Sequence, residues 1–275
     1  MNFSDDFKSL LIKTSEGYIG HGNPNAKILF LGQEPAWNKD IPRQREQYLR
    51  EIATNRIEWE EIVARGDGYE MIDSYADNPD NVPIFYSPLH PWPLQKFQIR
   101  RGSEEDGNLV GRDGTATTWY YYQVLVNLIF SKSLAKDAML TFHRSTFHTD
   151  MSDAAYRQHD FTKNDSKASV IKRIELLMQP FYNSFPVVIA AVGNFPRDTY
   201  GDGYFGEVFG VKHIGNQAGE NLPWINVSVR EDDKPQLLIH CQQVSAPLPN
   251  AYFKRIAEIV RDFANKNNVD LNPSR

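Results

Sequence analysis

The chain has 275 residues, of which 41% are apolar and 24% are charged, and it carries a formal net charge of −5. A chain of this length buries about 75% of the surface that unfolding would expose, so it forms a core without disulfides or structural metals. The composition excludes disordered, collagen-like and low-complexity proteins, and the charge excludes a strongly basic nucleic-acid-binding coat, although a local basic groove remains compatible with it.

Helices alternate with short apolar strands along the chain. Apolar residues at helical spacing predict helices, and short continuous apolar runs predict buried strands. In chain order, we expect a helix at 5–13, a strand at 27–32, helices at 43–66 and 117–130, a strand at 138–142, a helix at 167–185 that breaks near Pro180, strands at 187–193, 224–229 and 236–239, and a final helix capped by Asn250.

This alternation predicts an α/β protein. Strands that are apolar on both faces and separated by helices favour a mostly parallel sheet with helices on both sides. We therefore expect a three-layer α/β/α sandwich with four or five strands, built as one domain over residues 1–275. Residues 67–115 contain Asn-Pro, Ser-Pro, His-Pro and Trp-Pro pairs and several glycines, which predict a loop-rich insertion of the kind that serves as a binding loop or lid.

Polar side chains follow the predicted strands. In open parallel sheets, ligands bind beyond the carboxyl ends of the strands, so the residues that follow each strand are the first candidates for a site. The side chains in these positions are Gln33, Glu34, His143, Asn194 and His240.

Four segments resemble motifs of the uracil-DNA glycosylase superfamily. Its first motif, an apolar strand that runs into Gly-Gln-Asp-Pro or Gly-Glu-Ala-Pro, is similar to KILFLGQEPAWN at 27–38. Its last motif, a strand that ends in His-Pro-Ser before a helix, resembles QLLIHCQQVSAPLPNAYFKRI at 236–256. VVIAAVGN at 187–194 resembles its third-strand segment, and LVGRDG at 109–114 is similar to a Phe-Val-Gly-Arg-Ala-Gly segment of the iron–sulfur branch. The resemblance implies the superfamily's fold over most of residues 20–266.

The resemblance also implies roles for individual residues. Glu34 would orient a water or stabilise the positive charge that develops on the sugar, and His240 would donate a hydrogen bond to the departing base. Gln33 and His143 would read the base. The other residues that would contact the base are Pro35, Phe85, Leu109 and Asn194, with Phe85 as the stacking candidate. The residues that would contact DNA are Leu248 as an apolar wedge and Lys254 and Arg255 at phosphates.

The chain departs from the superfamily pattern at several positions. Cys241 and Gln242 stand where Pro and Ser are usual, Leu109 stands in place of a stacking Phe, and Ala36 stands in place of a Tyr that excludes thymine. The stretch at 140–143, which matches the second-strand motif, lacks the Asn that reads uracil. Cys241 is the only cysteine, so it excludes the iron–sulfur branch and any disulfide framework, and it is expected to be a buried small residue.

Each candidate also has a purely structural explanation. In this explanation Glu34 is a solvated loop residue, His240 is bonded to a backbone carbonyl, and Phe85 belongs to a small core beneath the loop. A metal hydrolase is a third hypothesis, but its candidate ligands have no standard zinc spacing, so surface histidines are favoured. Those candidate ligands are His143, His148, Asp150 and His159.

The sequence therefore predicts a DNA glycosylase-like hydrolase that removes a damaged or misplaced base from a flipped-out nucleotide. The alternative is a non-catalytic or re-specialised relative that binds nucleic acid or a nucleotide-like ligand in the same cleft. We expect DNA as the partner, no metal or cofactor, and a monomer. The sequence shows no signal-peptide pattern and no apolar run long enough to cross a bilayer, so we expect a cytoplasmic protein.

Overall fold

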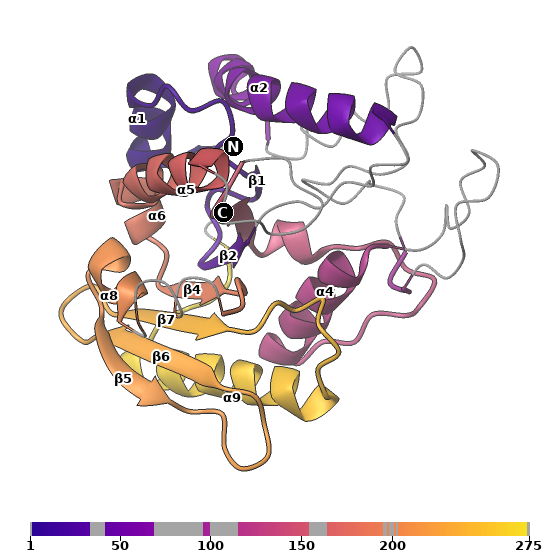
Figure 1. Cartoon of the computed structure of the whole chain (residues 1–275), viewed down its shortest axis with the longest axis vertical. Helices are drawn as coiled ribbons and strands as arrows, with labels where there is room; N and C mark the ends of the chain where they lie inside the picture. The colour runs from indigo at the N-terminus through magenta and orange to yellow at the C-terminus, as the bar shows by residue number, and fades with distance from the viewer. Residues whose placement is uncertain are drawn as a thin grey trace.

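The computed structural model describes residues 2–33, 42–68, 96–99, 115–153, 164–194, 197, 201 and 203–273. Within these ranges a seven-stranded sheet lies at the centre of the fold, in the order β1-β3-β2-β4-β7-β6-β5 (Figure 1). The strands are β1 (His21–Gly22), β2 (Ile28–Gly32), β3 (Phe147–Asp150), β4 (Val187–Ala190), β5 (Lys212–Asn216), β6 (Ile225–Arg230) and β7 (Gln236–Cys241).

The sheet is mixed rather than mostly parallel. Strands β3, β2, β4 and β7 lie side by side and run parallel, whereas β1 pairs antiparallel with β3, and β6 and β5 extend the sheet antiparallel beyond β7. Parallel neighbours need a long crossover, and the short links between β5, β6 and β7 permit antiparallel pairing instead. The prediction of an α/β protein is confirmed, and the prediction of four or five mostly parallel strands is wrong.

Helices cover both faces of the sheet. Side chains alternate along β2, so that Leu29 and Leu31 pack into one core while Ile28 and Phe30 pack into the other. The first core is covered by α1, α2, α5, α6 and α8, and the second by α4 and α9 (Figure 1). The helices are α1 (Asp5–Lys13), α2 (Pro42–Arg65), α4 (Thr117–Ile129), α5 (Asn164–Leu177), α6 (Pro180–Asn183), α8 (Tyr204–Phe209) and α9 (Asn250–Asn267).

The ends of the helices follow from local sequence. The Ser4 hydroxyl accepts a hydrogen bond from the Phe7 N–H and caps α1. The predicted break near Pro180 is confirmed, because α5 ends before it and α6 begins at this proline, which has no N–H to leave unpaired. Asn250 is the first residue of α9 and not its cap, because Pro249 takes the capping position.

The predicted strand at 138–142 is wrong. The chain there enters a short 3-10 helix (Phe142–Arg144), and the second parallel strand is β3, several residues later. Two backbone N–H groups, those of Thr141 and Phe142, donate to the Gln123 side chain of α4 at 2.7 and 2.8 Å. Leu140 and Phe142 are buried in the same core as α4, whereas Met139 is exposed, so this apolar run packs without forming a strand.

Most of the predicted insertion at 67–115 lies outside the described residues. Its described part forms two isolated bridges, one between Lys96 and Met139 and one between Ile99 and Thr115. Among the described helices, none is long and apolar enough to cross a membrane.

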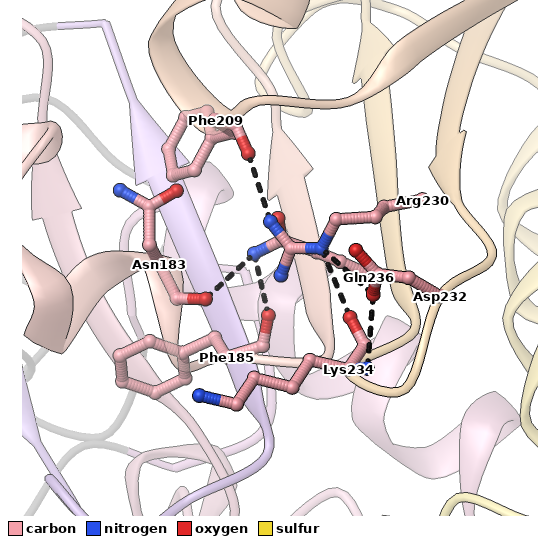
Figure 2. Close-up of polar contacts among 7 residues, drawn as sticks. All are labelled: Asn183, Phe185, Phe209, Arg230, Asp232, Lys234 and Gln236. Atoms are coloured by element: carbon pink, nitrogen blue, oxygen red, sulfur yellow. Dashed lines mark hydrogen bonds and ion pairs between the residues drawn. The ribbon is translucent and has the colours of Figure 1, made fainter.

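A polar network fixes the amino end of β7 (Figure 2). The buried Gln236 amide donates to the carbonyls of Phe185 at 2.8 Å and Asn183 at 3.4 Å. Arg230, at the end of β6, donates to the carbonyls of Lys234 at 3.0 Å and Phe209 at 3.4 Å. These bonds tie the β6–β7 turn to the segments before β4 and after α8. They lie at the edge of the sheet opposite the carboxyl ends of the parallel strands.

Candidate functional site

The four parallel strands bring their carboxyl ends to one edge of the sheet. The strand register pairs Gly32 with Asp150, and Ala190 with both Leu31 and His240, so the chain leaves all four strands at nearly the same level. We call this edge the rim. It consists of residues 32–33, 150–153, 193–194 and 240–243. Gln33, Asn194 and His240 all lie on it, as expected from the rule that polar residues after parallel strands converge.

Asp150 occupies the end of the second parallel strand. Its carboxylate lies so close to the α-carbon of Gly32 that a β-carbon there would collide with Oδ1. The Tyr122 hydroxyl of α4 lies 3.5 Å from the position that such a β-carbon would take. An alanine at Gly32 would require the Asp150 carboxylate to move, so the glycine lets this carboxylate take its present position. Sequence reasoning did not place Asp150 at the end of a strand, because it assigned this strand to 138–142.

The backbone behind Asp150 is held by a buried arginine. Arg173 of α5 is 0% exposed, and its Nε donates to the Asp150 carbonyl at 3.0 Å. The same guanidinium donates to the Tyr18 carbonyl and the Thr149 hydroxyl, and it lies 5.1 Å from the centre of the Tyr18 ring. A buried cation is costly unless its N–H groups are bonded, so this arrangement specifies the position of the β3 end closely.

Burial raises the pKa of two groups near the rim. The pKa of Tyr122 lies well above its usual value, first because of burial and then because of the negative charge of Asp150. Burial also raises the pKa of Cys241 to about 12. Both groups therefore stay protonated at neutral pH, and Cys241 is a buried thiol, as predicted, and not a nucleophile.

Gln33 and Gln243 join the ends of β2 and β7. The Gln243 amide donates to the Gln33 side-chain oxygen, and Gln33 is only 7% exposed. Gly193 lies beside this pair with a φ of 67°, and a β-carbon there would lie 3.4 Å from Gln243 Cγ. The left-handed backbone at Gly193 turns the chain after β4 so that its carbonyl faces His240.

His240 is buried and hydrogen-bonded within the rim. Its side chain is 2% exposed, and Nε2 donates to the Gly193 carbonyl at 2.8 Å. The rings of Phe205 and Trp224 lie edge-on to it, with centroids 5.0 and 4.8 Å away. Because a carbonyl only accepts hydrogen bonds, the proton lies on Nε2 and is donated to Gly193. This is the bond expected if His240 has a purely structural role.

An amide and aromatic cluster lies beside His240. The Asn194 side-chain oxygen accepts hydrogen bonds from Gln242 Nε2 at 3.1 Å and from the Trp224 indole at 3.2 Å. Arg197 lies over the Trp224 ring at 4.6 Å. The Tyr252 hydroxyl of α9 donates to the Trp224 carbonyl and accepts from the Gln242 N–H, both at 3.0 Å. Sequence reasoning assigned Trp224 only to a strand. Its place on the rim follows from its hydrogen bond to Asn194, which can be recognised only once the fold is known.

The structure does not bring His143 to the rim. His143 lies in the short 3-10 helix before β3, and its carbonyl accepts from the Asn23 N–H at 2.9 Å near β1. It therefore lies at the amino end of the strand, at the sheet edge opposite the rim. The prediction that His143 follows a strand is wrong for this reason.

The residues predicted to contact DNA lie around α9. Leu248 is half-buried and packs against the core beneath α4 and α9. Lys254 is exposed, while the Arg255 guanidinium donates to the Gln217 carbonyl at 2.9 Å and lies 3.5 Å from Glu258. The other predicted site residues lie outside the described residues; they are Glu34, Pro35, Phe85 and Leu109.

No metal-binding group is found in the described part of the chain. His143, His148 and Asp150 do not form a set of three ligands there, and His159 lies outside the described residues. His148 is instead buried and stacks on His21 at 5.8 Å between centroids.

Comparison with protein-family models and with curated proteins gives no match for this chain. The motif residues and their arrangement on the rim are therefore the basis for the functional proposal.

Proposed function

We propose that this protein is a DNA glycosylase-like hydrolase with a uracil-DNA glycosylase-like sandwich fold, which cleaves the N-glycosidic bond of a flipped-out damaged or misplaced base. One observation supports the proposal above all: the segments that resemble the first and last superfamily motifs end side by side on the rim. Gln33 from the first motif accepts a hydrogen bond from Gln243 of the last. Motif residues that are 210 positions apart in sequence thus meet at the carboxyl ends of the parallel strands, where ligands bind in open α/β sheets.

The proposed chemistry needs an anion near the sugar and a hydrogen-bond donor near the base. Glu34, which follows Gln33 in the chain, would stabilise the sugar cation or orient water. His240 would stabilise the departing base by donating its Nε2 proton to the base oxygen in place of the Gly193 carbonyl. Gln33 and Asn194 would contact the base. This scheme uses no metal or cofactor, and we propose that the protein acts on DNA as a cytoplasmic monomer.

One observation favours a second candidate function. Because His240 is 2% exposed and its Nε2 proton is bonded to Gly193, the rim in this form offers no free imidazole donor from that nitrogen. A protein that binds nucleic acid or a nucleotide-like ligand without cleavage would need none. We therefore keep a non-catalytic binding function as the alternative.

The test is single-turnover base release from oligonucleotides that carry uracil, hypoxanthine, xanthine or a mismatch. Binding is measured in parallel by fluorescence anisotropy. We expect Glu34→Gln and His240→Ala each to lower the cleavage rate by about 100- to 1,000-fold with affinity almost unchanged, because both groups act on charge that develops in the transition state.

Matched controls are Glu175→Gln on the exposed face of α5 and His213→Ala on the edge strand β5, which should cleave at the wild-type rate. Full activity in both the Glu34 and the His240 variant would disprove the roles of these two residues. DNA binding by the wild type without release of any base would favour the non-catalytic alternative.

A further inference from the structure

Two side-chain amides and one indole meet on the rim beside His240, and we call Asn194, Trp224 and Gln242 the amide cluster. The Asn194 side-chain oxygen accepts hydrogen bonds from the Trp224 indole at 3.2 Å and from Gln242 Nε2 at 3.1 Å. Asn194 follows β4, Gln242 follows β7 and Trp224 precedes β6, so the ends of three strands build the cluster. Asn194 is exposed and the other two residues are half-buried, so the cluster is accessible from solvent.

The indole fixes the direction of both amides. An indole N–H only donates, so the Asn194 group that faces it must be the oxygen and not the amino group. That oxygen only accepts, so the Gln242 group bonded to it must be the amino group. Trp224 is itself held in place, because the Tyr252 hydroxyl donates to its carbonyl at 3.0 Å and Arg197 lies 4.6 Å from its ring centre.

Each amide keeps one polar group that the protein does not use. Within the described part of the chain, neither the Asn194 Nδ2 amino group nor the Gln242 Oε1 oxygen has a hydrogen-bond partner. The amide cluster thus presents a donor on Asn194 and an acceptor on Gln242. This pair complements a planar ligand edge that carries an acceptor beside a donor, which is the pattern on the edges of nucleobases.

We propose that the amide cluster reads the base, with Gln242 as a specificity-determining residue and Trp224 as the positioning residue that sets the order of donor and acceptor. This inference rests on the proposed function, since it assumes that a base binds at the rim. Uracil and cytosine carry the two groups in opposite order, because N3–H and O4 of uracil are replaced by an unprotonated N3 and an amino group in cytosine. A cluster with a fixed order pairs with one of these edges and sets donor against donor for the other.

The experiment uses two DNA duplexes that differ only in one central base, uracil or cytosine. This base lies opposite an abasic site, so neither base gives up a partner when it leaves the helix, and the edges of all other bases are paired. We expect the full-length wild-type protein to bind the two duplexes with affinities about 10- to 100-fold apart, as measured by anisotropy, because a correctly ordered pair of hydrogen bonds discriminates by this amount.

Two variants test the residues of the cluster. Trp224→Phe keeps an aromatic ring and removes the indole N–H, so both amides can rotate and the two affinities should come within about threefold of each other. Gln242→Met keeps the length of the side chain without its amide and should have the same effect. Gln179→Met, between α5 and α6 on the segment before β4, is the control and should keep the wild-type ratio. A purely structural role of Trp224 would weaken binding of both duplexes equally and leave their ratio unchanged.

The wild-type protein alone can overturn the inference. Equal affinity for the two duplexes, or no binding to either, would do so even if a variant did not fold. A ratio that Trp224→Phe or Gln242→Met leaves at the wild-type value would overturn it as well.

Base release from the same duplexes separates this inference from the proposed function. If the two affinities differ in the wild type and converge in the variants but no base is released, the glycosylase proposal fails and the base-reading assignment stands. If a base is released while the two affinities are equal, the glycosylase proposal stands and the base-reading assignment is wrong.

Discussion

Gly32 and the Asp150 side chain lie close together on the rim. The lack of a side chain at Gly32 lets the Asp150 carboxylate lie over the end of β2, while the Tyr122 hydroxyl lies close by. Gln33, the neighbouring residue, is held by Gln243. A single glycine thus allows side chains from two parallel strands and from α4 to occupy the same small region.

Gly32→Ala should therefore destabilise the protein by about 1–3 kcal/mol, which is typical of overpacking, and should displace the Asp150 carboxylate. Urea unfolding measures the loss of stability. Gly203→Ala is the matched control, because a β-carbon there meets no atom within 4 Å and the backbone φ is −85°. If the two variants were equally stable, the crowding at Gly32 would have no energetic consequence.

At the level of residues, the sequence predicted part of the candidate site. Gln33, Asn194 and His240 were found because each follows an apolar run that is a strand in the structure. The position of Asp150 at a strand end was not predicted, because β3 contains His, Thr and Asp and lacks a continuous apolar run. Trp224 was not found because its role depends on contacts with residues far away in sequence.

At the level of elements, hydrophobic pattern predicted four of the inner strands but missed the inner strand β3 and both edge strands. β2, β4, β6 and β7 are largely buried and apolar, so their sequences resemble buried strands. β5 is an edge strand in which exposed and half-exposed residues alternate, and β1 has only two residues. Neither carries a pattern that distinguishes it from a loop.

The polar network at the amino end of β7 gives a prediction at this scale. Gln236→Leu should lower the free energy of unfolding by about 1–3 kcal/mol, because the buried carbonyls of Phe185 and Asn183 would lose their common donor. Chemical denaturation followed by circular dichroism measures the change.

Lys234→Met is the control for the same region (Figure 2). The Lys234 residue contributes only its backbone groups to this network, so this variant should change stability by less than about 0.5 kcal/mol. A Gln236→Leu protein as stable as wild type would show that the hydrogen bonds of the Gln236 amide to these carbonyls add no net stability.

At the level of the whole molecule, the core contains one cysteine thiol and several tyrosine hydroxyls whose pKa values are raised by burial. Burial raises the pKa of Cys241 to about 12 and raises the pKa values of four tyrosines above the usual value near 10. The tyrosines are Tyr18, Tyr122, Tyr182 and Tyr252. The unfolded chain releases these protons at lower pH than the folded chain does.

The folded state therefore binds more protons than the unfolded state at alkaline pH, and stability should fall as pH rises. The contribution is intact below about pH 8.5 and is lost progressively from about pH 9 upwards, where unfolded Cys and Tyr ionise. Melting temperatures measured from pH 7 to pH 11 test this, with tyrosinate absorbance as a second readout. A melting temperature that stays constant to pH 11 would contradict it.

Tyr182→Phe provides a matched variant. Its hydroxyl donates to the Ile19 carbonyl at 2.8 Å, so the variant should lose about 1 kcal/mol at pH 7. Because one titrating group is removed, its stability should decline less steeply between pH 9 and pH 11 than that of the wild type.

The order of the strands also determines when the rim can form during synthesis on the ribosome. Of the four parallel strands, β2 emerges first, and its two neighbours in the sheet are β3 and β4. The second edge of β4 is paired only after β7, at residues 236–241, has been synthesised. A nascent chain that ends before β7 has an exposed apolar edge on β4 and lacks the His240 and Gln243 contacts. Such long-range pairing slows folding, so the incomplete sheet is the stage at which this chain depends most on protection from aggregation.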